Sequence, residues 1–216
     1  MSFLNTILDI IFPVNCISCG KNGVDLCLKC ISNCQPAEYE DQKWIYPIFN
    51  YRDTHIKKSI WLLKYKGKKG LAKIFATIIH DRIVEELADL MVFENFTEPI
   101  LIPVPLAPKR KRERGFNQAE IICQELIKLD KNKNFKLENN ILIKQKDTIH
   151  QANIKNRNKR LKNLAGSFSV KNPEQIKGKN VILIDDVSTT GATFNEAKKT
   201  LKQAGVKKVI AFAIAH

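Results

Sequence analysis

The chain has 216 residues, enough for one α/β domain with a small appendage. Its hydrophobic content of 44% supports a packed core, and no segment reaches the ~20 apolar residues that span a bilayer. A formal net charge of +14 favours polyanionic partners: nucleic acid, anionic lipid or phosphorylated ligands.

Residues 3–12 are mostly apolar but are interrupted by Asp9. No basic residue precedes them and no small-residue cleavage site follows, so the pattern is not that of a signal peptide. We expect a short amphipathic helix that packs on its own domain, with a membrane-surface role as the alternative. The cytoplasm is the expected location.

Two Cys-x-x-Cys pairs follow, and each can supply two thiolates from one tight turn. In a reducing compartment, such pairs suit a tetrahedral Cys₄ zinc site better than two disulfides. The predicted ligands are Cys16, Cys19, Cys27 and Cys30. Unmetallated cysteines are the alternative. Cys34 is close enough to compete as a ligand but is expected to be a free thiol, whereas Cys123 is expected in the core.

Strands and helices alternate along the rest of the chain. After a polar, acidic linker at 36–41, apolar runs predict strands at 45–51, 100–102, 141–143, 168–170, 181–184 and 208–213. The prolines after Ile102 are expected to stop sheet pairing. Helical spacing predicts helices at 55–66 and 69–90, from 117, and from 194 to a cap at Gly205. This order predicts an α/β fold, a parallel sheet flanked by helices with right-handed crossovers.

The stretch from Val181 to Thr193 carries the strongest signal of function. Its four apolar residues predict a buried strand, and Asp185 and Asp186 follow at the carboxyl end, where open α/β sheets place ligands. Gly191 permits a tight turn into a helix whose first N–H groups, with nearby hydroxyls, suit a phosphate monoester. The carboxylates suit a sugar diol or Mg²⁺. Together these groups describe a site for a ribose 5-phosphate group.

This stretch resembles the phosphoribosyl-pyrophosphate (PRPP) motif of type I phosphoribosyltransferases. The matching positions are Asp185, Asp186, Val187, Ser188, Thr189, Thr190, Gly191, Ala192 and Thr193. Further stretches resemble the ComF family of competence proteins, which joins an N-terminal zinc knuckle to a phosphoribosyltransferase-like domain. They are the cysteine pairs and residues 63–67, 104–110, 114–118 and 151–168.

The ComF resemblance implies a helix and knuckle at 1–40 and a phosphoribosyltransferase-like domain at 41–216. The chain departs from the family's pattern in two places. Only Cys34 follows Cys30, where many members have a further cysteine pair, and position 188 is Ser, where a β-branched residue is common. The first departure argues against a larger zinc module, and the second keeps the hydroxyl.

The resemblance implies a role in natural transformation: handling single-stranded DNA on the cytoplasmic side, with PRPP bound and with other competence or helicase proteins as partners. The alternative is an active enzyme that transfers phosphoribosyl from PRPP to a nucleobase with Mg²⁺ and releases pyrophosphate. The loop Val104, Pro105 and Leu106 would then hold the pyrophosphate, and Arg112 or Arg114 would stabilise the departing charge. No base-recognition hood is identifiable in the sequence.

Three basic tracts supply candidate nucleic-acid contacts. Lys57 to Lys73 contains seven lysines and no acid, and a solvated face and a binding face are equal alternatives there. The other two tracts are predicted to contact single-stranded DNA, with neighbouring aromatic side chains for stacking. Their residues are Lys109, Arg110, Lys111, Arg112 and Arg114 in one, and Lys155, Arg157, Lys159, Arg160 and Lys162 in the other.

Overall fold

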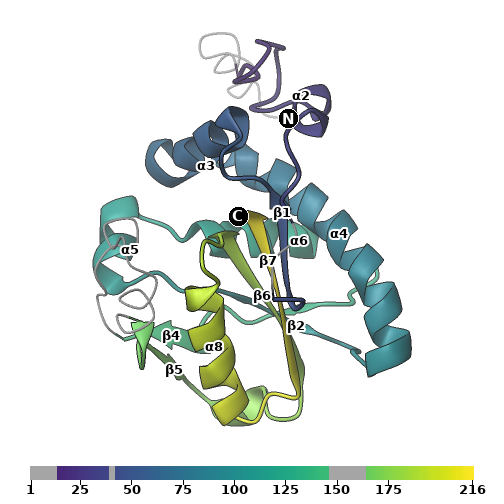
Figure 1. The fold of residues 1–216 in the computed structure, drawn as a ribbon. Helices are drawn as coiled ribbons and strands as arrows, with labels where there is room; N and C mark the ends of the chain where they lie inside the picture. The colour runs from purple at the N-terminus through teal and green to yellow at the C-terminus, as the bar shows by residue number, and fades with distance from the viewer. Residues whose placement is uncertain (1–13, 39–41, 146–163) are drawn as a thin grey trace.

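A computed structural model describes residues 14–38, 42–145 and 164–216 (Figure 1). The predicted helix at 3–12 and the basic tract at 155–162 lie outside the described residues. Among the described helices, none combines the length and the apolar character needed to cross a bilayer.

Five parallel strands form the central sheet, in the order β1-β7-β6-β2-β3. They are β1 (Ile45–Phe49), β2 (Ile100–Pro103), β3 (Lys136–Leu137), β6 (Asn180–Val187) and β7 (Lys208–Ala215). The predicted parallel sheet is therefore confirmed. β4 (Leu142–Lys144) and β5 (Phe168–Val170) were expected in the same sheet, but they pair antiparallel with each other in a separate ribbon. That pairing lets Leu142 and Phe168 face one core while Ile143 stays exposed.

Helices cover both faces of the sheet, with α8 on one side and α4 and α6 on the other (Figure 1). The described helices are α2 (Leu28–Ser32), α3 (Thr54–Lys66), α4 (Gly70–Glu94), α5 (Pro108–Arg114), α6 (Gln118–Leu129), α8 (Ala192–Gln203) and the 3₁₀ turn η2 (Pro173–Gln175). The helix α5 was not predicted. It begins at Pro108, which suits a first helical position, and ends at Gly115 with φ 76°.

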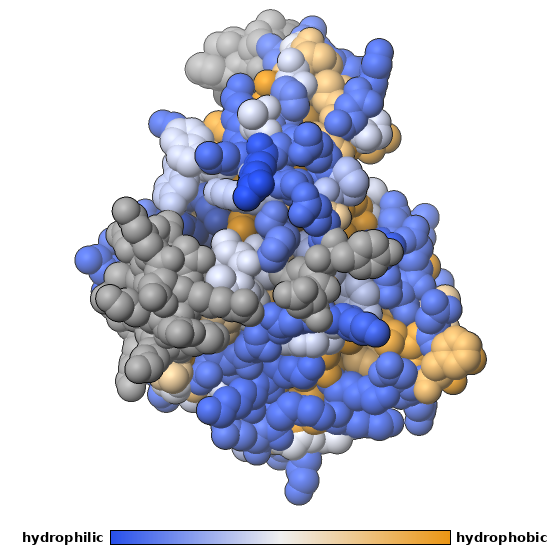
Figure 2. Space-filling model, in the orientation of Figure 1, coloured by the Kyte–Doolittle hydropathy of each residue, from blue (hydrophilic) through white to orange (hydrophobic). Residues whose placement is uncertain are grey.

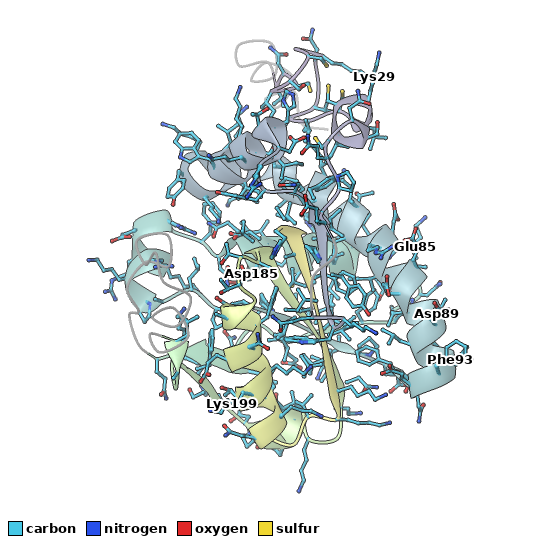
Figure 3. All side chains as sticks on the ribbon, viewed as in Figure 1. Lys29, Glu85, Asp89, Phe93, Asp185 and Lys199 are labelled. Carbon is cyan, nitrogen blue, oxygen red and sulfur yellow. The ribbon has the colours of Figure 1, made fainter. Side chains whose placement is uncertain are left out.

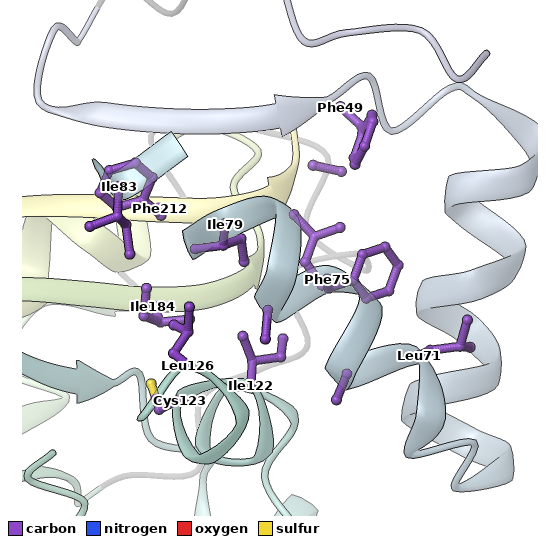
Figure 4. Packing of buried hydrophobic residues seen from close by; sticks show 14 of the residues in the cluster. Phe49, Leu71, Phe75, Ile79, Ile83, Ile122, Cys123, Leu126, Ile184 and Phe212 are labelled. Atoms are coloured by element: carbon purple, nitrogen blue, oxygen red, sulfur yellow. The ribbon is translucent and has the colours of Figure 1, made fainter. Parts of the chain in front are cut away.

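The strand β6 builds both halves of the core because its side chains alternate. Ile182 and Ile184 join the cluster formed with α4 and α6, whereas Val181 and Leu183 join the cluster with α8. Figure 4 shows Ile184 in the first cluster beside Leu126 and Phe212. Because both faces of the strand are buried, its first residues read as the continuous apolar run seen in the sequence.

Two sequence expectations about strand ends were wrong. β6 continues through Val187, so Asp185 and Asp186 belong to the end of the strand itself rather than to the loop that follows it. β2 includes Pro103, which is in register with Ile184. The pairing survives because Val104 N–H bonds Ile184 O at 2.9 Å, and β3 has already ended on the other side, where Pro103 has no N–H to offer.

The N-terminal knuckle packs at the end of the sheet where α3 begins (Figure 1). Lys58 Nζ donates to Ile17 O at 3.3 Å, and Lys68 Nζ pairs with Asp25 Oδ1 at 3.1 Å. Gln35 and the start of the predicted linker, residues 36 and 37, lie along the outer edge of β1, where Asn50 N–H bonds Gln35 O and Ala37 N–H bonds Ile48 O. These contacts protect an exposed strand edge and tie the knuckle to the sheet.

Most of the visible surface is hydrophilic, as the charge implies (Figure 2). An apolar patch lies over the C-terminal end of α4, where Met91, Val92 and Phe93 are exposed.

The carboxylate of Asp53 caps α3, and its removal should weaken the fold. Asp53 accepts N–H bonds from His55, Ile56 and Gln35, at 2.9, 3.1 and 3.0 Å. Burial opposes the charge, but these three N–H groups outweigh it and lower the pKa of Asp53. Asp53→Ala should therefore reduce the free energy of unfolding by about 0.5–2 kcal/mol at neutral pH.

The sign of the pH dependence follows from the lowered pKa. The stabilisation from Asp53 is complete above the ordinary carboxyl pKa of about 4 and is lost as the pH falls through the lower folded-state value. Urea unfolding of the parent, Asp53→Ala and Asp53→Asn, from neutral pH down through the carboxyl pKa, measures this loss of stability. Asn keeps a capping oxygen, so it should lose mainly the pH dependence. Equal stability of the parent and Asp53→Ala at neutral pH would contradict the capping role.

Candidate functional site

One cavity of about 360 Å³ gathers the predicted site residues at the carboxyl ends of β2 and β6. Its lining includes Val104, Pro105, Leu106, Arg110, Arg114, Asp185, Asp186, Val187, Thr189 and Thr193. Figure 3 marks Asp185 at this end of the sheet. A larger hollow of about 1020 Å³ lies between β1 and α4, but none of the predicted site residues lines it. The smaller cavity is therefore the functional candidate.

The two carboxylates point to opposite faces of β6. Asp186 follows Ile184 on the α4 side and pairs with Lys64 of α3, with 2.8 Å between Nζ and Oδ1. Asp185 lies on the other face, where its Oδ1 accepts the Asp186 N–H at 2.8 Å. Burial, followed by the charge of Asp186, raises the pKa of Asp185 to about 7. Near neutral pH this carboxyl can therefore exchange a proton, donate a hydrogen bond or accept one.

Positive side chains surround the acidic pair from three elements. Burial opposes the charge of Lys64, but Asp186 outweighs it and raises the pKa of Lys64. Lys144 at the end of β4 is buried and also lies close enough to favour the charge of Asp185. Arg110 and Arg114 of α5 complete the ring. Such a ring can neutralise an anionic ligand that approaches the carboxylates.

Arg112 and Arg114, the two arginines that we considered for catalysis, lie on different faces of α5. Arg110 and Arg114 are four residues apart, so they share one face of α5 and both line the cavity. Arg114 is fixed by a 2.9 Å bond from Nη1 to Gln118 Oε1. Arg112 projects from the opposite face, is exposed and does not line the cavity. Its proposed role in stabilising a departing pyrophosphate is therefore not supported, whereas Arg114 remains a candidate.

The turn from Ser188 to Gly191 brings the N-terminus of α8 to the cavity. Gly191 has φ 67°, and a Cβ at this position would overlap the Gln42 side chain, so the turn requires glycine. Ser188 N–H already bonds Ala215 O at 2.9 Å, which leaves the later amides and the α8 N-terminus for a ligand. Thr190 Oγ1 is buried without a hydrogen-bond partner. A phosphate oxygen would supply that partner.

The four predicted zinc ligands form one cluster, with all four sulfurs within 4.8 Å of one another. Cys19 and Cys27 Sγ are 3.7 Å apart. Thiolates held ~2.3 Å from a tetrahedral Zn²⁺ would be about 3.8 Å apart, so the cluster fits the ion. Cys34 is outside this cluster: its thiol donates to Cys30 O at 3.4 Å, and burial raises its pKa to about 11. Cys123 is fully buried, as predicted.

Backbone amides prepare one of these sulfurs to be a thiolate. Burial opposes the charge of Cys16, but N–H groups of Cys19, Cys27 and Ser18 outweigh it and lower the pKa of Cys16 to about 6. The Cys27 N–H reaches the Cys16 sulfur at 3.4 Å. Such N–H···S bonds are the outer support that metal-binding thiolates need.

Sequence reasoning missed two cations at the cavity, the partly buried Lys64 and the buried Lys144. Lys64 lies one helical turn after buried Ile60, and Lys144 lies two residues after buried Leu142 on the same strand face. A lysine that continues an apolar stripe at the correct period was the signal available in the sequence. The ion-pair partner of Lys64 could not be recognised in the sequence, because Asp186 is over a hundred residues away along the chain.

The raised pKa of Asp185 predicts a stability gain when its charge is removed. An unfolded chain releases this proton near pH 4, whereas the folded protein retains it to about pH 7, so stability falls as the pH rises between these values. Without ligand or Mg²⁺, Asp185→Asn should unfold at a higher temperature than the parent at pH 8, with a free energy of unfolding larger by more than about 1 kcal/mol. Below pH 4 the two proteins should be equally stable.

Thermal unfolding across this pH range checks the gain, with Asp89→Asn on exposed α4 as the matched control. If Asp185→Asn were less stable than the parent at pH 8, the inferred cost of the buried charge would be wrong.

Known proteins match both parts of the chain. Residues 112–216 match the family described as "Phosphoribosyl transferase domain". Among solved structures, a Trypanosoma cruzi hypoxanthine phosphoribosyl transferase is 15% identical with a TM-score of 0.38, covering 82% of this chain and 71% of that one. A likeness this distant carries no argument about activity.

Three curated relatives are informative. "Competence protein F" of Haemophilus influenzae is 35% identical over 54% of this chain and 49% of its own length. "Competence protein ComFC" of Streptococcus pneumoniae is 29% identical over 93% and 80%, respectively. "DNA utilization protein YhgH" of Escherichia coli O157:H7 is 30% identical over 50% and 45%. The match thus spans only about half of the first and third relatives. A phosphoribosyltransferase fold, a four-cysteine cluster that could hold zinc and similarity to competence proteins F and ComFC occur together in one chain, and together they support a ComF-family protein.

Proposed function

We propose that this protein binds PRPP with Mg²⁺ in the cavity at the carboxyl ends of β2 and β6 and handles single-stranded DNA in natural transformation, on the cytoplasmic side. The observation that carries the proposal is the convergence on one cavity of the acidic pair, the α8 N-terminus and cations from three separate elements. The names of the relatives, two competence proteins and a DNA utilization protein, support the biological role.

In this proposal each part of PRPP meets complementary chemistry. The 5-phosphate lies against the amides and hydroxyls of 188–193, where Thr190 Oγ1 lacks a partner. The ribose diol or Mg²⁺ faces Asp185 and Asp186. The pyrophosphate lies beside Val104–Leu106 with Arg110 and Arg114. When bound, Mg²⁺ would neutralise the charge of the pyrophosphate oxygens.

The active transferase remains the second candidate, and Arg114 is the observation that favours it. This guanidinium is fixed at the cavity, where it would stabilise a departing pyrophosphate. PRPP is therefore a ligand or regulator if the protein handles DNA, and a substrate if the protein is an active transferase.

DNA contacts in this proposal use the outer face of α5. Lys109, Lys111 and Arg112 are exposed there, on the side away from the cavity. Lys155, Arg157, Lys159, Arg160 and Lys162, which lie outside the described residues, are proposed to extend the same contact. Competence or helicase proteins that deliver or receive the strand are the expected protein partners.

Thr190→Val tests the PRPP site with a nearly isosteric change that removes the unpaired hydroxyl. Loss of one hydrogen bond to a charged ligand costs ~1.5–3 kcal/mol, so PRPP affinity should fall at least about tenfold. Titration calorimetry with PRPP, with and without Mg²⁺, measures the change. Thr200→Val is the matched control, because the Thr200 hydroxyl bonds Glu196 O within α8. Equal affinity in the parent and Thr190→Val would refute the assignment.

We also propose that the cysteine cluster binds one structural Zn²⁺. Its four sulfurs lie within 4.8 Å of one another, which supports the proposal, and metal binding would then contribute to the folding free energy of residues 14–34. Elemental analysis of untagged protein should find about one zinc per chain. Cys19→Ser should abolish this content, whereas Cys34→Ser and Cys123→Ser should leave it intact. A folded, metal-free parent would contradict the proposal.

A further inference from the structure

Two large aromatic side chains stand exposed at the mouth of the cavity. Trp61 and Tyr65 of α3 have exposed fractions of 48% and 52%, and both line the same cavity as Asp185. Their ring centroids are 5.9 Å apart. They are four residues apart, so one face of the helix presents both. Burying rings of this size is favourable, and leaving two exposed side by side marks a binding surface.

Each of these rings already carries a cation. The Arg114 guanidinium lies 5.0 Å from the centre of the Tyr65 ring, and Lys66 Nζ lies 5.7 Å from that of Trp61. Close by in the sequence, Lys69 Nζ lies 5.5 Å from the Phe116 ring. Rings interleaved with cations suit a ligand that has flat π faces joined by negative charges.

The structure also divides the lysine run from Lys57 to Lys73 into two groups. Lys58 and Lys68 hold the knuckle, and Lys64 pairs with Asp186, so these three serve the fold or the cavity. Lys57 and Lys66 remain exposed on α3 beside the aromatic pair. Three lysines of this run are therefore engaged in the fold or the cavity, whereas Lys66 lies over the Trp61 ring.

We propose that Trp61 and Tyr65 form a stacking platform for the bases of single-stranded DNA. A free nucleobase is neutral and would leave the surrounding lysines without a partner. Duplex DNA keeps its bases stacked inside, away from the rings. A single strand supplies both free base faces and successive phosphates, so it matches rings and cations together. The proposal rests on the DNA-handling function above and assigns it to residues outside the two tracts named from the sequence.

The platform adjoins the PRPP site and shares Arg114 with it. Arg114 contacts Tyr65 on one side and the cavity on the other. A base stacked on Tyr65 would therefore lie at the open side of the PRPP cavity.

Tryptophan fluorescence reports directly on the stacking step. The chain has two tryptophans, and Trp44 packs against Phe194 with Lys198 over its ring, away from the platform. Trp44→Phe leaves Trp61 as the sole reporter, and an oligothymidylate of about 16 nucleotides should quench its emission. Trp61→Phe, which keeps a stacking ring, should retain DNA affinity while Trp44 emission stays constant. Binding without any change in Trp61 emission would overturn the proposal.

Affinity measurements with a matched ligand separate stacking from charge. The double variant Trp61→Ala/Tyr65→Ala should bind oligothymidylate about tenfold or more weakly, whereas an abasic strand of equal length should bind the variant and the parent alike. The salt slope should be unchanged in that variant and should flatten by about 0.7 in Lys57→Ala. Phe93→Ala, an exposed aromatic at the far end of α4 (Figure 3), is the control and should bind as the parent does.

The outcomes distinguish this proposal from the function on which it rests. If the parent binds no oligothymidylate, the DNA-handling function fails together with the platform. If the parent binds it and the double variant binds equally well, only the platform fails. If thymine alone quenches Trp61 and the oligonucleotide does not, the rings belong to a transferase acceptor site and the platform is refuted. PRPP calorimetry on the parent tests the PRPP half of the function independently.

Discussion

The ion pair between Lys64 and Asp186 is the contact on which the arrangement of the site depends. Successive residues on a strand face opposite ways, so the two adjacent aspartates at the end of β6 meet different nearest partners. Lys64 forms the ion pair with Asp186 on the α4 side at 2.8 Å, and the charges of Lys64 and then of Lys144 also favour the ionised form of Asp185. Breaking the pair by removing Lys64 would leave a buried carboxylate uncompensated, which is far costlier than losing an exposed pair.

The position of Lys64 is set from outside the phosphoribosyltransferase-like domain as well as from within it. α3 starts at the Asp53 cap, and the knuckle is attached to its two ends through Lys58 and Lys68. The same core cluster contains Cys16 and Ile31 of the knuckle and Ile60 of α3. The cysteine cluster therefore supports the helix that supplies both a cavity cation and the exposed aromatic pair. This gives a physical reason for a small cysteine knuckle to accompany this fold.

Local patterns predicted most of the fold, and long-range pairing explains what they missed. The apolar run of β6, the glycine at 191 and the cysteine spacing each state a local requirement, so the strand, the turn and the cluster were all predictable from sequence. α5 was missed because its residues are almost all basic and carry no apolar period. Lys144 was missed because β4 turned out to belong to an antiparallel ribbon with β5, and nothing local specifies that partner.

The helix α5 shows how one basic tract can serve two surfaces. Residues four apart share a face, so Arg110 and Arg114 line the cavity while Arg112 projects outwards. A count of charges along the sequence does not distinguish the arginines that line the cavity from the one that faces outwards. The helical period does distinguish them. Arg114 lies at the boundary, bonded to Gln118 and stacked on Tyr65. If PRPP occupies the cavity and a base occupies the platform, both ligands act on this one side chain. The effect of each ligand on the affinity of the other must then be equal in free energy, because coupling between two binding sites is reciprocal.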